Sequence, residues 1–270
     1  MIQDPEAVLA AAAFGEEPGR WPLPAATTPR QRWLRAVAAG GQGRYASADA
    51  DLAALLREAP KGPLASLAYS TRASFARQLG GHDLARGLDG RALALALNDH
   101  EVDPEAAADA LVGLAADALG VGRFAASAAL LGRARQAPQP PGPARLAVRH
   151  NWVTAELAMV TGDGATAVRH AEQAVELVSG AGEDMVRHRV KSQVVLAGAL
   201  CCAGKRERAR TVADAAFDEA GRAGLVPLRW ALACLLIDAG SATRTAQELR
   251  DLRDETAELV RYRGGSWRGR

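Results

Sequence analysis

The sequence is poor in the side chains that stabilise β-sheets. Aromatic residues make up only 4% of its 270 positions, and β-branched residues are sparse outside a few segments. Alanine, by contrast, fills more than a fifth of the chain. Alanine is the best helix former and lets helices approach closely, whereas strands need branched or aromatic side chains. The composition therefore predicts an all-α protein.

The sequence also lacks a large charge of one sign, a long apolar run and a cysteine framework. Its formal net charge is +2, so no global field attracts nucleic acid or an anionic membrane. No apolar run approaches the roughly 18 residues of a transmembrane helix, and residues 1–6 lack the basic start of a signal peptide. Cys201, Cys202 and Cys234 are an odd set without disulfide-type spacing. We expect a cytoplasmic protein with no membrane partner.

Lysine is nearly absent, because Lys61, Lys191 and Lys205 are the only examples. Arginine carries almost all of the positive charge. Arginine and alanine codons are rich in G and C, so the composition indicates a high-GC genome such as that of an actinobacterium.

What the sequence does contain is a repeating unit. An amphipathic run is followed by a glycine-containing turn and then by a second run, and successive turn glycines are 36 to 42 residues apart. This spacing is typical of two-helix repeats. The turn glycines are Gly43, Gly80, Gly122, Gly162, Gly204 and Gly240.

Small residues keep a fixed position after each turn. One stands about five residues after the glycine and another stands seven residues later, so both lie on one face of the second helix, where helices approach closely. The first set is Ala48, Ala85, Ser127, Ala167, Ala209 and Thr245, and the second set is Leu55, Ala92, Ala134, Ala174, Ala216 and Leu252.

These positions resemble the tetratricopeptide-repeat family, whose signature places a turn glycine and small residues in the same relation. Tyr45 and Phe124, each two residues after a glycine, and Pro60 at the end of the first repeat also match. The family's Leu-Gly pair and first-helix tyrosine are mostly missing, and the period exceeds the family's usual 34. The resemblance implies a right-handed α-solenoid of about six helix-turn-helix repeats. Another α-solenoid class and a compact helical bundle are the alternatives.

The repeats divide the chain into three parts. Residues 1–28 are expected to form a short helix and a proline-rich arm that Trp21 anchors, residues 29–259 the elongated repeat array, and residues 260–270 a basic, flexible tail. Helix starts are indicated by a capping residue before proline at Asp4-Pro5, Thr28-Pro29 and Asp103-Pro104. The proline-rich residues 137–143 form a stiff connector, so the array is either one rigid superhelix or two jointed halves.

No pattern predicts a catalytic residue, a metal site or a cofactor. Residues 120–125 and 162–167 resemble part of a dinucleotide-binding loop, but that loop functions between a strand and a helix, and each of these segments follows an alanine-rich helix. Residues 198–205 lack the glycine spacing of a P-loop. The histidines are scattered and show no metal-ligand spacing.

The resemblance also implies a binding surface, because the first helices of tetratricopeptide repeats line a concave groove. Transferring the family register predicts exposed groove positions at which charge reversal is tolerated. The lysine and paired asparagines with which some family members hold a C-terminal carboxylate are not reproduced. The expected partner-binding residues are Ser70, Ser74, Arg77, Arg149, Trp152, Glu156, Lys191 and Val194. A solvated inner face without a ligand is the alternative.

Three tryptophans recur at one place in the repeats, namely Trp33, Trp152 and Trp230. They indicate either core packing between the two helices of a repeat, which we favour, or an aromatic stripe that contacts a ligand.

We therefore predict a non-catalytic interaction module, an assembly scaffold or regulatory adaptor, that binds a protein or peptide whose identity the sequence does not reveal. A regulatory sensor that binds a peptide or small ligand is the second hypothesis. Nucleic-acid contact through the basic tail is less favoured. The oligomeric state does not follow from the sequence. The basic tail residues are Arg261, Arg263, Arg268 and Arg270, beside Tyr262 and Trp267.

Overall fold

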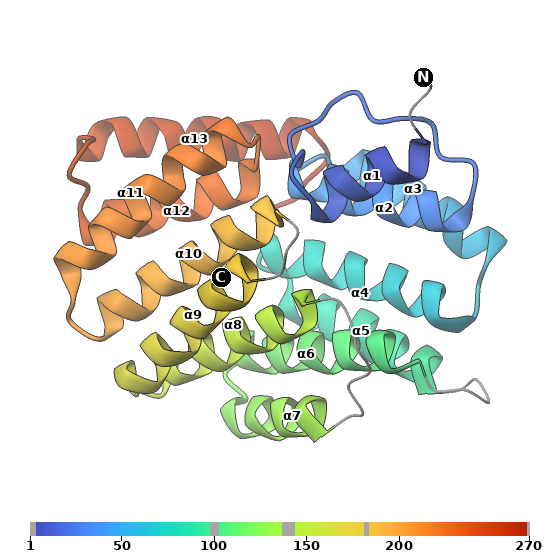
Figure 1. Ribbon diagram of the computed structural model, residues 1–270, viewed down its shortest axis with the longest axis horizontal. Helices are drawn as coiled ribbons and strands as arrows, with labels where there is room; N and C mark the ends of the chain where they lie inside the picture. The colour runs from blue at the N-terminus through green and yellow to red at the C-terminus, as the bar shows by residue number, and fades with distance from the viewer. Residues whose placement is uncertain (1–3, 98–102, 137–143, 181–183, 269–270) are drawn as a thin grey trace.

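The computed structural model describes residues 4–97, 103–136, 144–180 and 184–268, and within these ranges it contains thirteen α-helices and no strand (Figure 1). The all-α prediction is confirmed. The helices are α1 (Pro5–Phe14), α2 (Pro29–Gly41), α3 (Tyr45–Glu58), α4 (Gly62–Gln78), α5 (His82–Leu97), α6 (Pro104–Gly120), α7 (Phe124–Gln136), α8 (Arg145–Val160), α9 (Gly164–Ser179), α10 (Val186–Cys202), α11 (Arg206–Arg222), α12 (Val226–Ala239) and α13 (Ala246–Tyr262).

The three predicted proline starts each begin a helix. Thr28 caps α2 in a capping box with Gln31, and Asp103 accepts a hydrogen bond from the Ala106 amide of α6 at 2.8 Å. Asp4 caps α1 in the same manner. A capping oxygen satisfies an amide that has no partner in the first turn, and proline at the first position has no amide to satisfy.

All six turn glycines separate two helices and have φ between 73° and 84°. At Gly43 this left-handed conformation lets the Arg44 amide donate to the Ala39 carbonyl at 2.9 Å and so close the end of α2. A side chain at such a φ is strained. The glycines therefore divide α2 to α13 into six consecutive helix pairs, as their spacing predicts.

The small residues of the second helices are buried in the first five pairs, from Ala48 to Ala216. The sixth pair departs from the prediction, because Thr245 is exposed and caps α13. The turn after Gly240 is longer than the others, so α13 begins later and its buried positions shift by four residues. Leu249 and Thr256 take the buried places that were assigned to Thr245 and Leu252.

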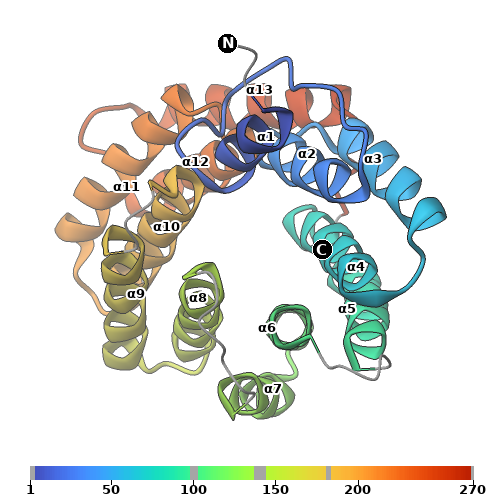
Figure 2. The same ribbon diagram turned by 45° about the vertical axis from the view of Figure 1, so that its right-hand side comes forward.

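The helix pairs follow one another around a ring (Figure 2). The first helices of successive pairs contact one another, from α2 through α4, α6, α8 and α10 to α12, and they lie on the inner side. The second helices lie outside them. Each pair thus packs chiefly on its neighbours, which is an arrangement compatible with helical repeats.

The two ends of the array meet, so the expectation of an elongated open array is wrong. The Ala46 amide donates to the Arg263 carbonyl at 3.1 Å, and Arg263 Nη1 donates to the Gln42 carbonyl at 2.7 Å. Val260 of α13 belongs to the same apolar core as Tyr45.

Residues 264–268 continue this closure rather than forming a loose tail. The Arg268 amide donates to the Leu79 carbonyl at 2.8 Å, and the Trp267 ring lies 4.3 Å from that of Trp230. The first contact connects the end of the chain to the second helix pair, and the second holds it against α12 of the sixth pair.

The N-terminal arm covers the junction between the first and the later helix pairs. Gln42 Nε2 donates to the Pro18 and Arg20 carbonyls at 2.9 and 3.0 Å, and the Val186 amide donates to Gly15 at 3.3 Å. Trp21 is 45% exposed, with the Arg44 guanidinium 3.8 Å from its ring centre. The expected connector at residues 137–143 lies outside the described residues.

Candidate functional site

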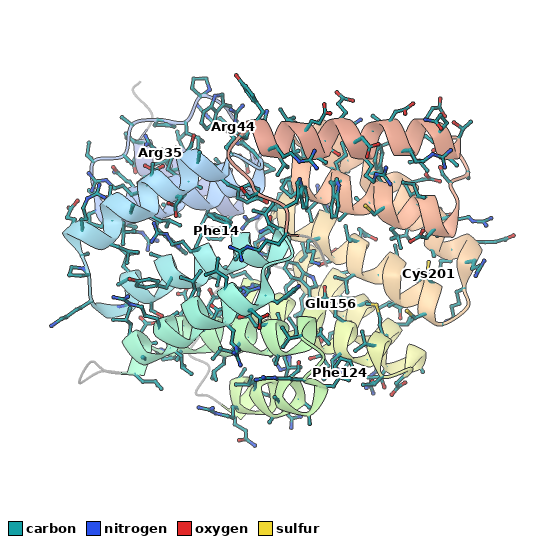
Figure 3. All side chains as sticks on the ribbon, turned by 180° about the vertical axis from the view of Figure 1, so that it is seen from behind. Phe14, Arg35, Arg44, Phe124, Glu156 and Cys201 are labelled. Carbon is teal, nitrogen blue, oxygen red and sulfur yellow. The ribbon has the colours of Figure 1, made fainter. Side chains whose placement is uncertain are left out.

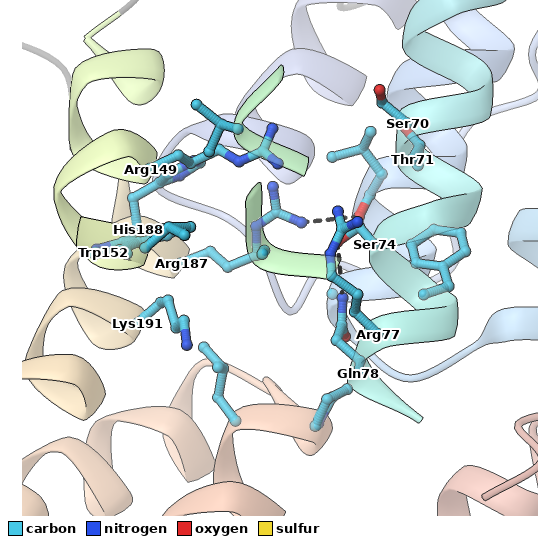
Figure 4. A pocket seen from close by; sticks show the side chains of 18 of the residues that line it. Ser70, Thr71, Ser74, Arg77, Gln78, Arg149, Trp152, Arg187, His188 and Lys191 are labelled. Carbon is cyan, nitrogen blue, oxygen red and sulfur yellow. Dashed lines mark hydrogen bonds between the residues drawn. The ribbon is translucent and has the colours of Figure 1, made fainter. Parts of the chain in front are cut away.

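The inner helices surround a cavity of about 450 Å³ (Figure 4). Phe14 of α1 and residues of all six first helices line it. Figure 3 shows that Phe14 and Glu156 lie near the middle of the molecule, whereas Phe124 and Cys201 lie toward its edge.

Seven of the eight expected groove residues line this cavity. Ser70, Ser74 and Arg77 project from α4, and Arg149, Trp152 and Lys191 face them from α8 and α10 (Figure 4). Glu156 of α8 lines the cavity as well. The exception is Val194, which packs against the apolar core between α10 and α12.

Arg77 is not an exposed groove residue, contrary to expectation. It donates to Asp117 at 2.9 Å and to Asp89, and both carboxylates are fully buried. Burial, together with the adjacent Asp89 charge, raises the pKa of Asp117 to about 7. A Cβ at Gly113 would lie 2.3 Å from Asp89 Oδ2, so glycine is needed there. Reversing the charge of Arg77 would leave two buried carboxylates without a cation, so this position is structural.

A second charged cluster joins α6 to α8. Arg145 Nη1 donates to Asp109 Oδ1 at 3.2 Å, and Arg149 also binds Asp109. Arg145 has a further partner in Glu105. Burial acts to raise the pKa of Asp109, but the Arg149 and Arg145 guanidiniums hold it below its ordinary value. These two arginines are therefore matched by two carboxylates.

Lys191 and Arg187 lie one turn apart on the inner face of α10. Lys191 Nζ is paired with Glu156 Oε1 at 3.0 Å. Arg187 Nη1 donates to the Val37 carbonyl at 3.3 Å, and its guanidinium lies 5.8 Å from the Phe14 ring centre. Burial and the neighbouring Arg149 and Arg145 charges lower the pKa of Arg187 to about 10, so it remains cationic at neutral pH.

The cavity wall is aromatic as well as basic. Trp33 Nε1 donates to Thr71 Oγ1 at 3.0 Å, and Trp152 Nε1 donates to Ser192 Oγ at 2.8 Å. All three recurring tryptophans line the cavity, and their rings also pack between helices. Trp33 contacts α4, Trp152 contacts α10 and Trp230 contacts the C-terminal segment, so the rings pack between neighbouring pairs rather than only within one repeat.

His188 is buried and its ring stacks on Trp152 with centroids 5.5 Å apart. Burial, with the Arg187, Arg145 and Arg149 charges, lowers the pKa of His188 well below its usual value. The imidazole is therefore neutral at pH 7.

Sequence reasoning missed Phe14, Asp109, Arg145, Arg187 and His188. A signal for two of them was present, because Arg145 stands four residues before Arg149 and Arg187 four residues before Lys191, on the same helical faces. Phe14 could not have been placed, since the short N-terminal helix lies outside the repeat pattern.

The remaining sequence candidates lie away from the cavity or serve the fold. Arg261 and Tyr262 are exposed, Arg263 donates to the Gln42 carbonyl, Trp267 packs beside Trp230 and against the core of the first helix pair, and Arg270 lies outside the described residues. Within the described ranges, no three His, Cys, Asp or Glu side chains are grouped so that they could hold a metal ion. None of the described helices is both long and apolar enough to cross a membrane.

The sequence matches no protein-family model and no curated protein.

Proposed function

We propose that this protein is a non-catalytic binding module built from about six tetratricopeptide-like repeats in a right-handed, closed array, and that it acts as an interaction or regulatory adaptor in the cytoplasm. The observation that carries the proposal is the central cavity, which all six first helices line. Its basic and aromatic wall provides the contacts that bind a peptide. Its charged side chains are largely tied into structural ion pairs, which supports binding rather than catalysis.

The closed ring favours a compact ligand over a long extended one. A cavity of about 450 Å³ lies in the range of sites that enclose small molecules or the end of a peptide. Closure therefore supports the second candidate function as well, a sensor that encloses a small ligand. Nucleic-acid binding is less favoured, because Arg263 and Trp267 are used in packing.

A cavity-filling substitution tests the proposal. Ala116 lines the cavity on α6, whereas Ala125 is exposed on α7. A library of random linear peptides and a library of small molecules are each screened against the wild-type protein, with native mass spectrometry to measure occupancy. We expect Ala116→Phe to abolish binding of the selected ligands and the matched control Ala125→Phe to retain it.

The two libraries separate the candidate functions. Selected peptides that Ala116→Phe rejects support the adaptor, and selected small molecules support the sensor. Ligands that bind Ala116→Phe as well as the wild type would place the site elsewhere, and the absence of any ligand from both libraries would contradict the proposal.

A further inference from the structure

The charges on the cavity wall are unevenly compensated. Arg145 and Arg149 share Asp109 and Glu105, and Lys191 is paired with Glu156. Arg77 lies between two aspartates. Arg187 differs from all of these, because it forms no ion pair with any described residue. It is the surplus cation of the cavity.

The groups around Arg187 do not compensate its charge as a carboxylate would. Its side chain reaches α2, and its Cδ would lie 3.1 Å from a Cβ built on Gly41. Its other neighbours are Val37 of α2 and the Phe14 ring of α1. A guanidinium has five N–H donors, and among the described residues the one acceptor bound to Arg187 is the Val37 carbonyl at 3.3 Å. A desolvated charge without a partner is costly to the folded protein.

Two neighbouring guanidiniums, although they are paired with carboxylates, also act on Arg187. Arg145 and Arg149 are close enough to depress the pKa of Arg187, after burial itself. Behind the wall, the Asp89–Asp117 pair carries excess negative charge, but that pair is already bound to Arg77 and readily holds a proton at neutral pH. It therefore offsets the Arg187 charge only in part.

The rest of the wall indicates what the anion carries with it. Trp152 and Trp33 line the cavity beside Phe14, and the lining contains apolar side chains from α6 and α12 as well. A bare inorganic ion would leave most of a cavity of this size in contact with water. An anion with an apolar body fills the space and covers the rings.

From these observations we infer that the central cavity binds an organic carboxylate, whose planar carboxylate is held by the Arg187 fork and whose apolar part lies against Trp152 and Trp33. This deepens the proposed binding function and rests on it. Arginine is suited to the role because its two parallel N–H groups match the two oxygens of a carboxylate.

The test uses the full chain and a defined panel of probes. Aromatic and aliphatic monocarboxylates, including 3-phenylpropionate, are titrated by calorimetry against the wild-type protein, each beside its neutral primary amide. We expect at least one acid to bind and its amide to bind about tenfold more weakly or not at all, because the amide lacks the charge. Peptides ending in phenylalanine, with free or amidated C-termini, form a separate arm.

Variants then assign the contact to Arg187. Arg187→Met should reduce affinity for the acid about tenfold or more, and Arg187→Lys should give an intermediate loss because it keeps the charge without the fork. Arg169→Met, on the exposed side of α9, is the matched control and should bind as the wild type does.

Stability distinguishes a ligand-binding arginine from a structural one. If Arg187 serves the ligand, Arg187→Met without ligand should melt at the wild-type temperature or above, because an uncompensated buried charge is removed. A markedly lower Tm would assign Arg187 to the fold and overturn the inference.

The outcomes separate this inference from the proposed function. Library ligands that bind while every acid in the panel fails would overturn the carboxylate inference and leave the binding module intact. Preference for peptide C-termini over all of the small acids would confirm the carboxylate contact on Arg187 but contradict a small-molecule ligand. Equal affinity of Arg187→Met and wild type for the acids would contradict the assigned contact.

Discussion

Individual buried charges distinguish the centre of this protein from an ordinary helical core. Asp89 on α5 and Asp117 on α6 approach one arginine, and Gly113 leaves the space that Asp89 occupies. Two carboxylates and one guanidinium cannot all be neutralised by pairing. Burial and the second carboxylate therefore favour the protonated form of Asp117 in the folded protein.

We predict that Asp117 makes the folded protein less stable as pH rises from 5 to 8. The pKa of Asp117 is raised from the ordinary 3.8 to about 7 on folding, so the folded state binds more protons in this range. Its contribution to stability is complete below pH 4 and is lost as pH rises through 7, at no more than about 1.4 kcal/mol per pH unit. Asp117→Asn removes this dependence.

The measurement is the free energy of unfolding in urea at several pH values, taken as the difference between wild type and Asp117→Asn. The difference is needed because His188, whose pKa is lowered on folding, contributes the opposite slope below about pH 6.5. Asp83→Asn changes an exposed carboxylate on α5 and should reproduce the wild-type profile. Parallel profiles for wild type and Asp117→Asn would contradict the prediction.

At the scale of the helix, local sequence signals were reliable except where a turn changed length. Proline starts, capping residues and turn glycines depend on backbone hydrogen bonds within a few residues, so they can be read from the chain directly. The sixth pair shows where these local signals fail. Four extra turn residues before α13 moved its buried face from Thr245 and Leu252 to Leu249 and Thr256.

Substitution of two leucines on α13 checks this shift. Leu249 is 1% exposed within the core formed by α10 to α13, so Leu249→Ala should lower the free energy of unfolding by about 2–5 kcal/mol. Leu252 is only partly buried against the same core. Leu252→Ala is the matched comparison and should lower it by about 1 kcal/mol. Equal losses of stability in urea denaturation, or a greater loss for Leu252→Ala, would instead support the buried positions that the glycine spacing predicts.

At the scale of the whole molecule, closure of the ring changes what the inner surface can bind. An open array offers a long groove, whereas with its ends in contact the inner helices surround a central cavity of about 450 Å³. Those contacts come from the last turn of α13 and residues 263–268. The segment that we expected to be a flexible tail therefore determines the shape of the binding space.

We predict that deleting residues 264–270 loosens the junction between the ends. The deletion removes the Trp267–Trp230 stack and the hydrogen bond from Arg268 to Leu79. Amide exchange should increase at residues 42–48 and 79–81, and the radius of gyration from X-ray scattering should rise. Trp267→Phe, which keeps an aromatic ring in place, should retain most of the protection. An unchanged radius with unchanged exchange would show that α13 alone holds the ring closed.

The candidate site divides in the same way between what could be predicted and what could not. The register transferred from the tetratricopeptide repeat predicted that Ser74, Trp152 and Lys191 lie on the inner face. This succeeded because helical periodicity alone sets which side of a helix a residue occupies. It did not show that Arg77 is buried between two aspartates from other helices. Nor did it show that Arg187 has no carboxylate partner in the described part of the chain, since pairing depends on which helices lie across the cavity.

The amino-acid sequence by itself determined the helices, their pairing around six glycine turns and the inner face of each pair, because these follow from hydrogen bonds and periodicity over a few tens of residues. Only the tertiary structure decided that the ends meet, that the inner helices surround a cavity and that Arg187 on its wall forms no ion pair with a described residue. The physical reason is that closure depends on small rotations between successive pairs, which accumulate around the ring. No local sequence pattern determines the total of these rotations.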